Sequence, residues 1–151
     1  MQPIMSAEAL TKLLVEDFPQ LLSGGHHFRI DAVESGRVQV TLQTAEHHLR
    51  PGGTVSGPSL FALADVAAYL VILAHIGPIL SVVTTNMSMN FLTRPKLGDL
   101  IGESRLIRLG RRLAVIEISI RTAGEADPCA HAVATYAIPK QLSAAENSAV
   151  T

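Results

Sequence analysis

Residue types that mark several common functions are scarce in this chain. It contains no tryptophan, and aromatic residues make up only 4% of the sequence, which argues against the stacking platforms that bind single-stranded nucleic acid. The 12 basic and 13 acidic residues leave a formal net charge of -1, so the chain lacks an overall positive field to attract nucleic acid or an anionic membrane. We therefore expect no nucleic acid and no membrane among its partners.

Cysteine and targeting signals are scarce as well. The single cysteine, Cys129, cannot form an internal disulfide, and the first residues lack the basic start and apolar stretch of a secretory signal peptide. These features favour a reducing, cytoplasmic location. The six histidines and the cysteine show no spacing typical of metal ligands, so we expect no metal site.

Apolar residues, by contrast, are abundant. They make up 48% of the 151 residues, which is enough for one sizeable core. No repeat or linker-like stretch divides the sequence, so we expect one domain over residues 1–151. From about Lys140 the chain is rich in Ala, Ser and Asn without periodicity, which predicts a frayed tail.

The longest apolar run extends from Pro58 to Leu80 and reaches the ~20 residues of a membrane span. A span is nevertheless disfavoured, because Asp65 and His75 lie inside the run. Gly77-Pro78 also interrupts its end, and only Arg50 lies close by as a basic flank. The run therefore predicts a core helix that is apolar nearly all round and must be wrapped by other elements.

The remaining segments alternate between apolar and polar residues, which is typical of half-buried strands. Short turns between them favour antiparallel pairing, and a strongly curved sheet is the best cover for such a helix. The sequence thus predicts an α+β hotdog fold, a long central helix wrapped by a curved antiparallel sheet of about five to six strands. The predicted strands are His27–Val33, Arg37–Thr44, Val82–Leu92, Leu100–Leu109, Leu113–Thr122 and Cys129–Ile138, with a short helix over Ser6–Leu14 and a loop through Pro19 and Gly24-Gly25.

Asp65 is the residue in the central run that most needs an explanation. Hydrocarbon surrounds it in sequence, and burying an unpaired carboxylate costs several kcal/mol in effect. An interior carboxylate without an evident partner is a candidate for catalysis. The alternative is a structural carboxylate held by a local hydrogen bond.

The expected start of the helix offers a second functional group. Gly52-Gly53 and Gly57 flank it, Ser56 is suited to cap it, and Pro58 fits its first turn. Free amides at such a start can stabilise negative charge developing on a carbonyl oxygen. An ordinary cap and turn is an equally acceptable interpretation.

Gly57 and Asp65 are too far apart to act on one small group from the same helix. They are eight residues apart, which a helix spreads over ~12 Å, whereas catalytic contacts require about 3 Å. If both act on one carbonyl, they must come from two subunits. The spacing therefore predicts a twofold dimer with composite sites.

Two adjoining segments read Pro51-Gly52-Gly53-Thr54-Val55-Ser56-Gly57 and Leu60-Phe61-Ala62-Leu63-Ala64-Asp65. They resemble the signature of hotdog-fold acyl-CoA thioesterases of the phenylacetate-degradation type. The resemblance implies hydrolysis of an acyl- or aryl-CoA, with Asp65 as general base or nucleophile and the Gly57 N–H of the other subunit polarising the carbonyl. Coenzyme A would be part of the substrate, with no separate cofactor, and relatives stack their dimers into tetramers. The likeness covers roughly residues 42–139, with the signature at 51–57 and 60–65 and further matching pieces at 90–95, 98–99 and 110–114.

Several further residues receive roles from this resemblance. Ser56 stands where the family usually has His, and Arg50 where it has Asn or Gln. Arg50 is suited to contact the thioester oxygen, to pair with Asp65, or simply to reach solvent. Thr85 is the nearest match to the Ser or Thr that helps to position the nucleophile in relatives.

Cations in two turns are expected to bind the phosphates of coenzyme A. Solvated turn charges are the alternative for each of them. The size of the acyl pocket depends on which large side chains line it. The cations are Arg94, Lys96, Arg111 and Arg112, and the candidate pocket residues are Tyr69, Met87, Met89 and Phe91.

Acyl-CoA thioester hydrolysis is therefore the leading hypothesis. A non-catalytic acyl-CoA-binding protein is the alternative, motivated by the Ser56 and Arg50 replacements. Hydratase chemistry is a weaker third, because relatives of that class pair an Asp with a His a few residues later and none follows Asp65 in this way.

Overall fold

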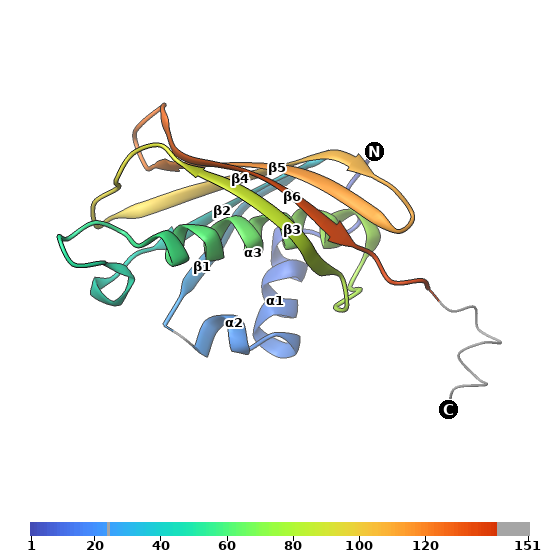
Figure 1. Ribbon diagram of the computed structural model, residues 1–151. Coiled ribbons are helices and arrows are strands. Elements are labelled where there is room, and N and C mark those ends of the chain that lie inside the picture. The colour runs from blue at the N-terminus through green and yellow to red at the C-terminus, as the bar shows by residue number, and fades with distance from the viewer. Residues whose placement is uncertain (24, 142–151) are drawn as a thin grey trace.

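A computed structural model describes residues 1–23 and 25–141 (Figure 1). The expected frayed tail falls almost entirely on residues 142–151, outside the described residues. The elements are α1 (Ala7–Asp17), α2 (Gln20–Ser23), β1 (His27–Glu34), β2 (Arg37–Gln43), a 3-10 turn (Glu46–His48), α3 (Gly57–Ile76), β3 (Val83–Phe91), β4 (Asp99–Leu109), β5 (Leu113–Thr122) and β6 (Pro128–Ala137).

All six strands form one antiparallel sheet in the order β1-β2-β4-β5-β6-β3. The sheet curves over α3, and α1 and α2 lie on the opposite side of this helix (Figure 1). This arrangement confirms the predicted α+β hotdog fold. The sheet ends at β1 on one side and at β3 on the other.

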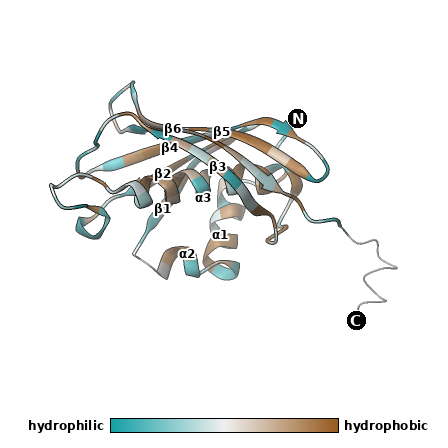
Figure 2. Ribbon diagram, in the orientation of Figure 1, coloured by the Kyte–Doolittle hydropathy of each residue, from teal (hydrophilic) through white to brown (hydrophobic). Residues whose placement is uncertain are grey.

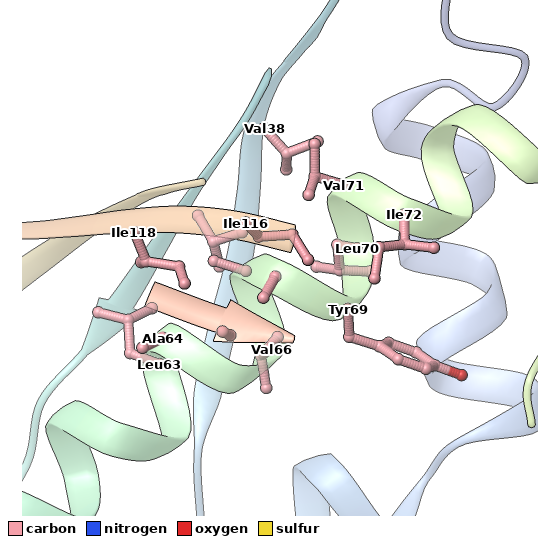
Figure 3. Close-up of a cluster of buried hydrophobic side chains, with 14 of the residues drawn as sticks. Val38, Leu63, Ala64, Val66, Tyr69, Leu70, Val71, Ile72, Ile116 and Ile118 are labelled. Carbon is pink, nitrogen blue, oxygen red and sulfur yellow. The ribbon is translucent and has the colours of Figure 1, made fainter. Parts of the chain in front are cut away.

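Helix α3 begins and ends where the sequence indicates. The Ser56 side chain caps it by accepting a hydrogen bond from the Ser59 N–H, and Gly77 ends it with φ of 97°, a conformation that favours glycine. In the most apolar 18-residue stretch of this helix 72% of the residues are buried. Figure 2 colours the ribbon by hydropathy, and the labelled side chains of α3 point to several sides in Figure 3. The run is therefore a core helix, as predicted.

The sheet approaches α3 closely at one point in β4. A Cβ added to Gly102 would lie 3.0 Å from Leu63 Cγ, tighter than a side chain normally tolerates. Beside this contact, the buried Ser104 hydroxyl donates to the Ala67 carbonyl oxygen at 2.7 Å. The absence of a side chain at Gly102 thus lets the helix sit against the concave face.

A β-bulge in β3 changes the predicted orientation of its first residues. The pairing of β3 with β6 slips between Thr84 and Asn86, leaving Thr85 as the extra residue. Thr84, Met87 and Met89 consequently share the face toward the helix, opposite inward positions of β6. Unbroken alternation along the predicted strand Val82–Leu92 would place Thr85 on that face with Met87 and Met89, and the bulge moves Thr85 off it.

The N-terminal segment also differs from expectation. Helix α1 extends to Asp17, three residues beyond the predicted end, with Ser6 as its cap rather than its first residue. A short second helix, α2, occupies part of the predicted loop. Leu10, Leu13 and Leu14 are buried and fix α1 to the core.

Candidate active site

Asp65 lies in the middle of α3 and is only partly buried. The Thr84 hydroxyl donates to its Oδ1 at 2.7 Å. The Tyr136 hydroxyl contacts the same Oδ1 and lies 2.8 Å from the Asp65 main-chain oxygen. Among the described residues no donor contacts Oδ2, so one carboxylate oxygen is held and the other is free.

These contacts partly match the structural interpretation of Asp65, since hydrogen bonds within the protomer do hold its carboxylate. They come from β3 and β6, far away in sequence, and so were invisible in the apolar run. However, Asp65 also lines a pocket of about 170 Å³. A carboxylate that lines a pocket and has only one of its oxygens bound is suited to accept a proton or to attack a carbonyl carbon.

Tyr136 is the site residue that sequence reasoning missed. It is 1% exposed, and burial together with the nearby Asp65 charge raises the pKa of its hydroxyl. The group therefore stays protonated and acts as a donor. The available signal was a tyrosine at an inward position near the end of a strand, since a buried tyrosine hydroxyl usually has a polar partner.

Gly57 is the first residue of α3. It lines a second pocket, of about 280 Å³, together with Arg50, Leu60, Phe91 and Arg94. In the described part of the chain no acceptor is bonded to its N–H. The amide is therefore available to a ligand at the positive end of the helix dipole.

The pockets at Asp65 and Gly57 share no lining residue. Within one protomer the carboxylate and the amide thus face different spaces, as their spacing along α3 requires. Tyr69 lines the Asp65 pocket and Phe91 the Gly57 pocket, whereas Met87 and Met89 line neither.

A histidine contact supports the loop before α3. The His48 carbonyl oxygen accepts from the Ser56 N–H at 2.8 Å. The His48 ring is 1% exposed, and its Nδ1 accepts from the Ala45 N–H at 2.8 Å. Its proton must therefore lie on Nε2, which donates to His26 Nδ1 at 3.0 Å.

Comparison with known proteins identifies the family. A profile of the thioesterase superfamily matches residues 52–129, just over half of the chain. The chain belongs to the thioesterase superfamily. It is thus classed with thioester hydrolases, and the matched region contains Gly57, Asp65 and Thr84 but not Tyr136.

Solved structures of similar proteins agree. A candidate thioesterase from Silicibacter sp. TM1040 is 45% identical, with a TM-score of 0.82 over 92% of this chain and 95% of that one. A hypothetical thioesterase from Streptococcus pneumoniae, solved with coenzyme A, is 27% identical, with a TM-score of 0.73 over 85% and 99%. A phenylacetic acid degradation-related candidate thioesterase from Ralstonia eutropha is 25% identical, with a TM-score of 0.72 over 84% and 98%.

In this thioesterase the arginines that were expected to contact the substrate lie near opposite ends of β3. Arg50 and Arg94 line the Gly57 pocket beyond the Phe91 end. Arg111 and Arg112 lie in the turn before β5 and line a pocket of about 510 Å³. This turn is near the Thr84 end of β3, because Leu113 at the start of β5 and Val83 at the start of β3 both pair with Ala137 of β6. Arg50 is exposed and forms no ion pair with Asp65 of its own protomer.

The threonine that contacts Asp65 is Thr84, and the prediction of Thr85 for this contact is wrong. The Thr85 hydroxyl donates instead to the Thr135 carbonyl oxygen at 3.0 Å. The bulge adds one residue to β3, so a comparison of sequences without a gap reaches Thr85 instead of Thr84. Ser56 is confirmed as the cap of α3, and its contact with substrate stays a prediction.

Two donors on one Asp65 oxygen lead to a prediction about catalysis. Thr84→Val and Tyr136→Phe each remove one hydroxyl while keeping side-chain shape. A hydrogen bond to a charged group is worth about 1.5–3 kcal/mol, so we expect kcat for thioester hydrolysis to fall roughly 10-fold in each variant. Thr85→Val is the matched control and should leave kcat unchanged. Equal losses in Thr84→Val and Thr85→Val would contradict the assignment.

The buried His48 leads to a prediction about pH. Burial, with His47 and His26 nearby, lowers the pKa of His48. As the pH falls below about 6.5, the unfolded chain binds this proton before the folded chain does, so the free energy of unfolding decreases. Urea titrations at about pH 7.5 and pH 5.5 should show a smaller pH dependence in His48→Asn than in the wild type. The exposed His27→Gln serves as control, and an unchanged slope in His48→Asn would refute the prediction.

Proposed function

We propose that this protein hydrolyses an acyl- or aryl-CoA thioester to the free acid and coenzyme A. The observation that carries the proposal is the Asp65 carboxylate, which lines a pocket while Thr84 and Tyr136 hold its Oδ1 and no described residue donates to its Oδ2. As general base, Asp65 takes a proton from water while the water oxygen bonds to the thioester carbonyl carbon. The C–S bond then breaks, and the proton passes to the departing thiolate.

Direct attack by Asp65 is the alternative first step. A carboxylate oxygen would then displace the thiolate and form a mixed anhydride, which water hydrolyses. Single turnover in H₂¹⁸O separates the two routes. Direct attack followed by water addition at the aspartyl carbon leaves label on Asp65, whereas the base mechanism places it only in the released acid.

The second half of the site is proposed to come from a partner subunit. Strand β3 is a sheet edge of nine residues, and its exposed Val83 and Phe91 would be covered by a second copy. Antiparallel pairing of two β3 strands about a twofold axis near Met87 and Ser88 would set Thr84 opposite the partner's Phe91.

This pairing would unite the two pockets. Thr84 marks the Asp65 pocket, while Phe91 lies beside Gly57, with its Cζ 3.4 Å from the position of an added Cβ. The partner's Gly57 N–H would then reach the carbonyl oxygen of a thioester at Asp65. Two such dimers would then stack as a dimer of dimers, as the resemblance to the phenylacetate-degradation type implies.

The same pairing would bring both cation groups to one site. Arg111 and Arg112 would flank the Thr84 end of one subunit, beside Arg50 and Arg94 from the partner. Together they would form a positive rim for the phosphates of coenzyme A. Ser56 would act through the cap that orders the glycine amide.

A subunit-mixing experiment tests the function and the composite site together. Asp65→Asn removes the catalytic carboxylate, and Gly57→Pro removes the amide N–H at a helix position that tolerates proline. Each variant alone should release no thiol from an acyl-CoA panel. After denaturation and refolding as an equal mixture, half of the dimers are mixed and carry one intact site each, so about a quarter of wild-type activity should return.

Three outcomes would count against parts of this proposal. No activity after mixing, with folded heterodimers present, would contradict a site shared between subunits. Activity in Asp65→Asn would remove that residue from the chemistry. Tight acyl-CoA binding by the wild type without any turnover would favour the non-catalytic alternative, which the Ser56 and Arg50 replacements motivate.

The phosphate rim has its own test. Arg94→Gln and Arg111→Gln each change one exposed cation, and we expect each to raise KM for an acyl-CoA by about 2- to 5-fold at low salt, since exposed ion pairs contribute up to about 1 kcal/mol. The matched substrate is the same acyl group on N-acetylcysteamine, which lacks the phosphates. An equal KM increase for both substrates would contradict phosphate binding.

A further inference from the structure

The pocket beside Asp65 has one polar corner and otherwise apolar walls. Asp65, Thr84 and Tyr136 form the corner, and the two hydroxyls both donate to the Asp65 carboxylate. The volume of the pocket is about 170 Å³. The remaining lining residues are Phe18, Leu21, Val66, Tyr69, Val82 and Val83.

Phe18 and Leu21 belong to a different part of the chain from the rest of the pocket. Phe18 directly follows α1 and Leu21 lies in α2, both outside the residues 52–129 that match the family profile. Thr84 and Tyr136 approach from the sheet, whereas α1 and α2 lie on the other side of α3 (Figure 1). The N-terminal helices thus supply the wall that faces away from the sheet.

This wall is fixed and offers no free polar group from Tyr69. The Phe18 ring packs edge to face on Tyr69, with centroids 5.9 Å apart, and its N–H donates to the Leu14 carbonyl oxygen at the end of α1. The Tyr69 hydroxyl is already bound to the Leu80 carbonyl oxygen at 3.1 Å, and burial raises its pKa. Tyr69 therefore presents a neutral ring edge, and an apolar group is the best ligand for this space.

The size of the pocket limits what can enter. An apolar cavity of about 150 Å³ holds one benzene molecule, whereas pockets for drug-sized ligands measure about 300–1,000 Å³. A space of 170 Å³ therefore accepts one ring or a chain of about six carbons. The pantetheine arm and nucleotide of coenzyme A must lie outside it.

We propose that the acyl group of the substrate occupies this pocket, that it is an apolar group of about six carbons or one ring, and that Phe18 is the residue that limits its length. The inference rests on the proposed function, because the thioester carbonyl is placed at Asp65. With the carbonyl in the polar corner, the acyl group extends between Val66 and Tyr69 toward Phe18 and Leu21. A longer chain has to displace the Phe18 ring from Tyr69.

The test is the dependence of kcat/KM on acyl length. Hexanoyl- and phenylacetyl-CoA should be preferred to dodecanoyl-CoA by at least 10-fold in the wild type, since one methylene of misfit in an apolar pocket is worth about 10- to 200-fold. Phe18→Ala should raise the dodecanoyl to hexanoyl ratio by at least about 10-fold. Val15→Ala changes an exposed residue of α1 and should leave the ratio unchanged.

Two further measurements keep the inference separate from the proposed function. Calorimetry of the binding of the same acyl-CoAs to the Asp65→Asn variant reports the length preference without turnover. Phe18→Leu shortens the side chain more gently in case Phe18→Ala does not fold, and should shift the preference in the same direction. An unchanged preference in a folded Phe18 variant, or a wild type that favours dodecanoyl-CoA, would overturn the inference. Length-dependent binding without hydrolysis by the wild type would support it while refuting the proposed function.

Discussion

The structure depends on one helix that is apolar on almost every side and can be buried only by being wrapped. Fourteen of the 20 residues of α3 are buried, and the sheet curves over this helix (Figure 1). Gly102 lets β4 approach the helix closely, because an added Cβ would lie 3.0 Å from Leu63 Cγ. The packing of the sheet on α3 also decides where along the helix a charged side chain, Asp65, can be tolerated.

Asp65 lies where the sheet stops covering the helix completely. Strand β3 is the sheet edge, and beyond it the N-terminal helices close the space only in part, which leaves a pocket. The bulge at Thr85 turns the Thr84 hydroxyl toward the carboxylate, and β6 brings the Tyr136 hydroxyl to the same oxygen. Two hydroxyl donors to one oxygen favour a negative charge there, which is how a carboxylate is tolerated on an otherwise apolar helix.

The edge position of β3 also links catalysis to association. A strand with an unpaired edge and exposed apolar side chains is unfavourable in an isolated subunit. Its two ends carry the two halves of the proposed chemistry, Thr84 beside Asp65 and Phe91 beside Gly57. Twofold pairing would therefore bury the edge and assemble two sites in the same step. The N-terminal helices lie outside the family profile. Changes in their sequence could therefore alter which acyl group is accepted without altering the pairing of β3 or the contacts of Asp65.

The sequence by itself determined the parts that rest on local patterns. The apolar run with a cap at Ser56 and a stop at Gly77 specified α3, and alternation specified the strands to within a few residues, because both depend on short-range periodicity. The lone Asp65 marked the site for the same reason. Only the tertiary structure decided which groups contact Asp65 and line its pocket. The bulge places Thr84 rather than Thr85 beside the carboxylate, and Tyr136 and Phe18 come from opposite ends of the chain. Such contacts depend on strand register and on packing between distant segments, which no local pattern encodes.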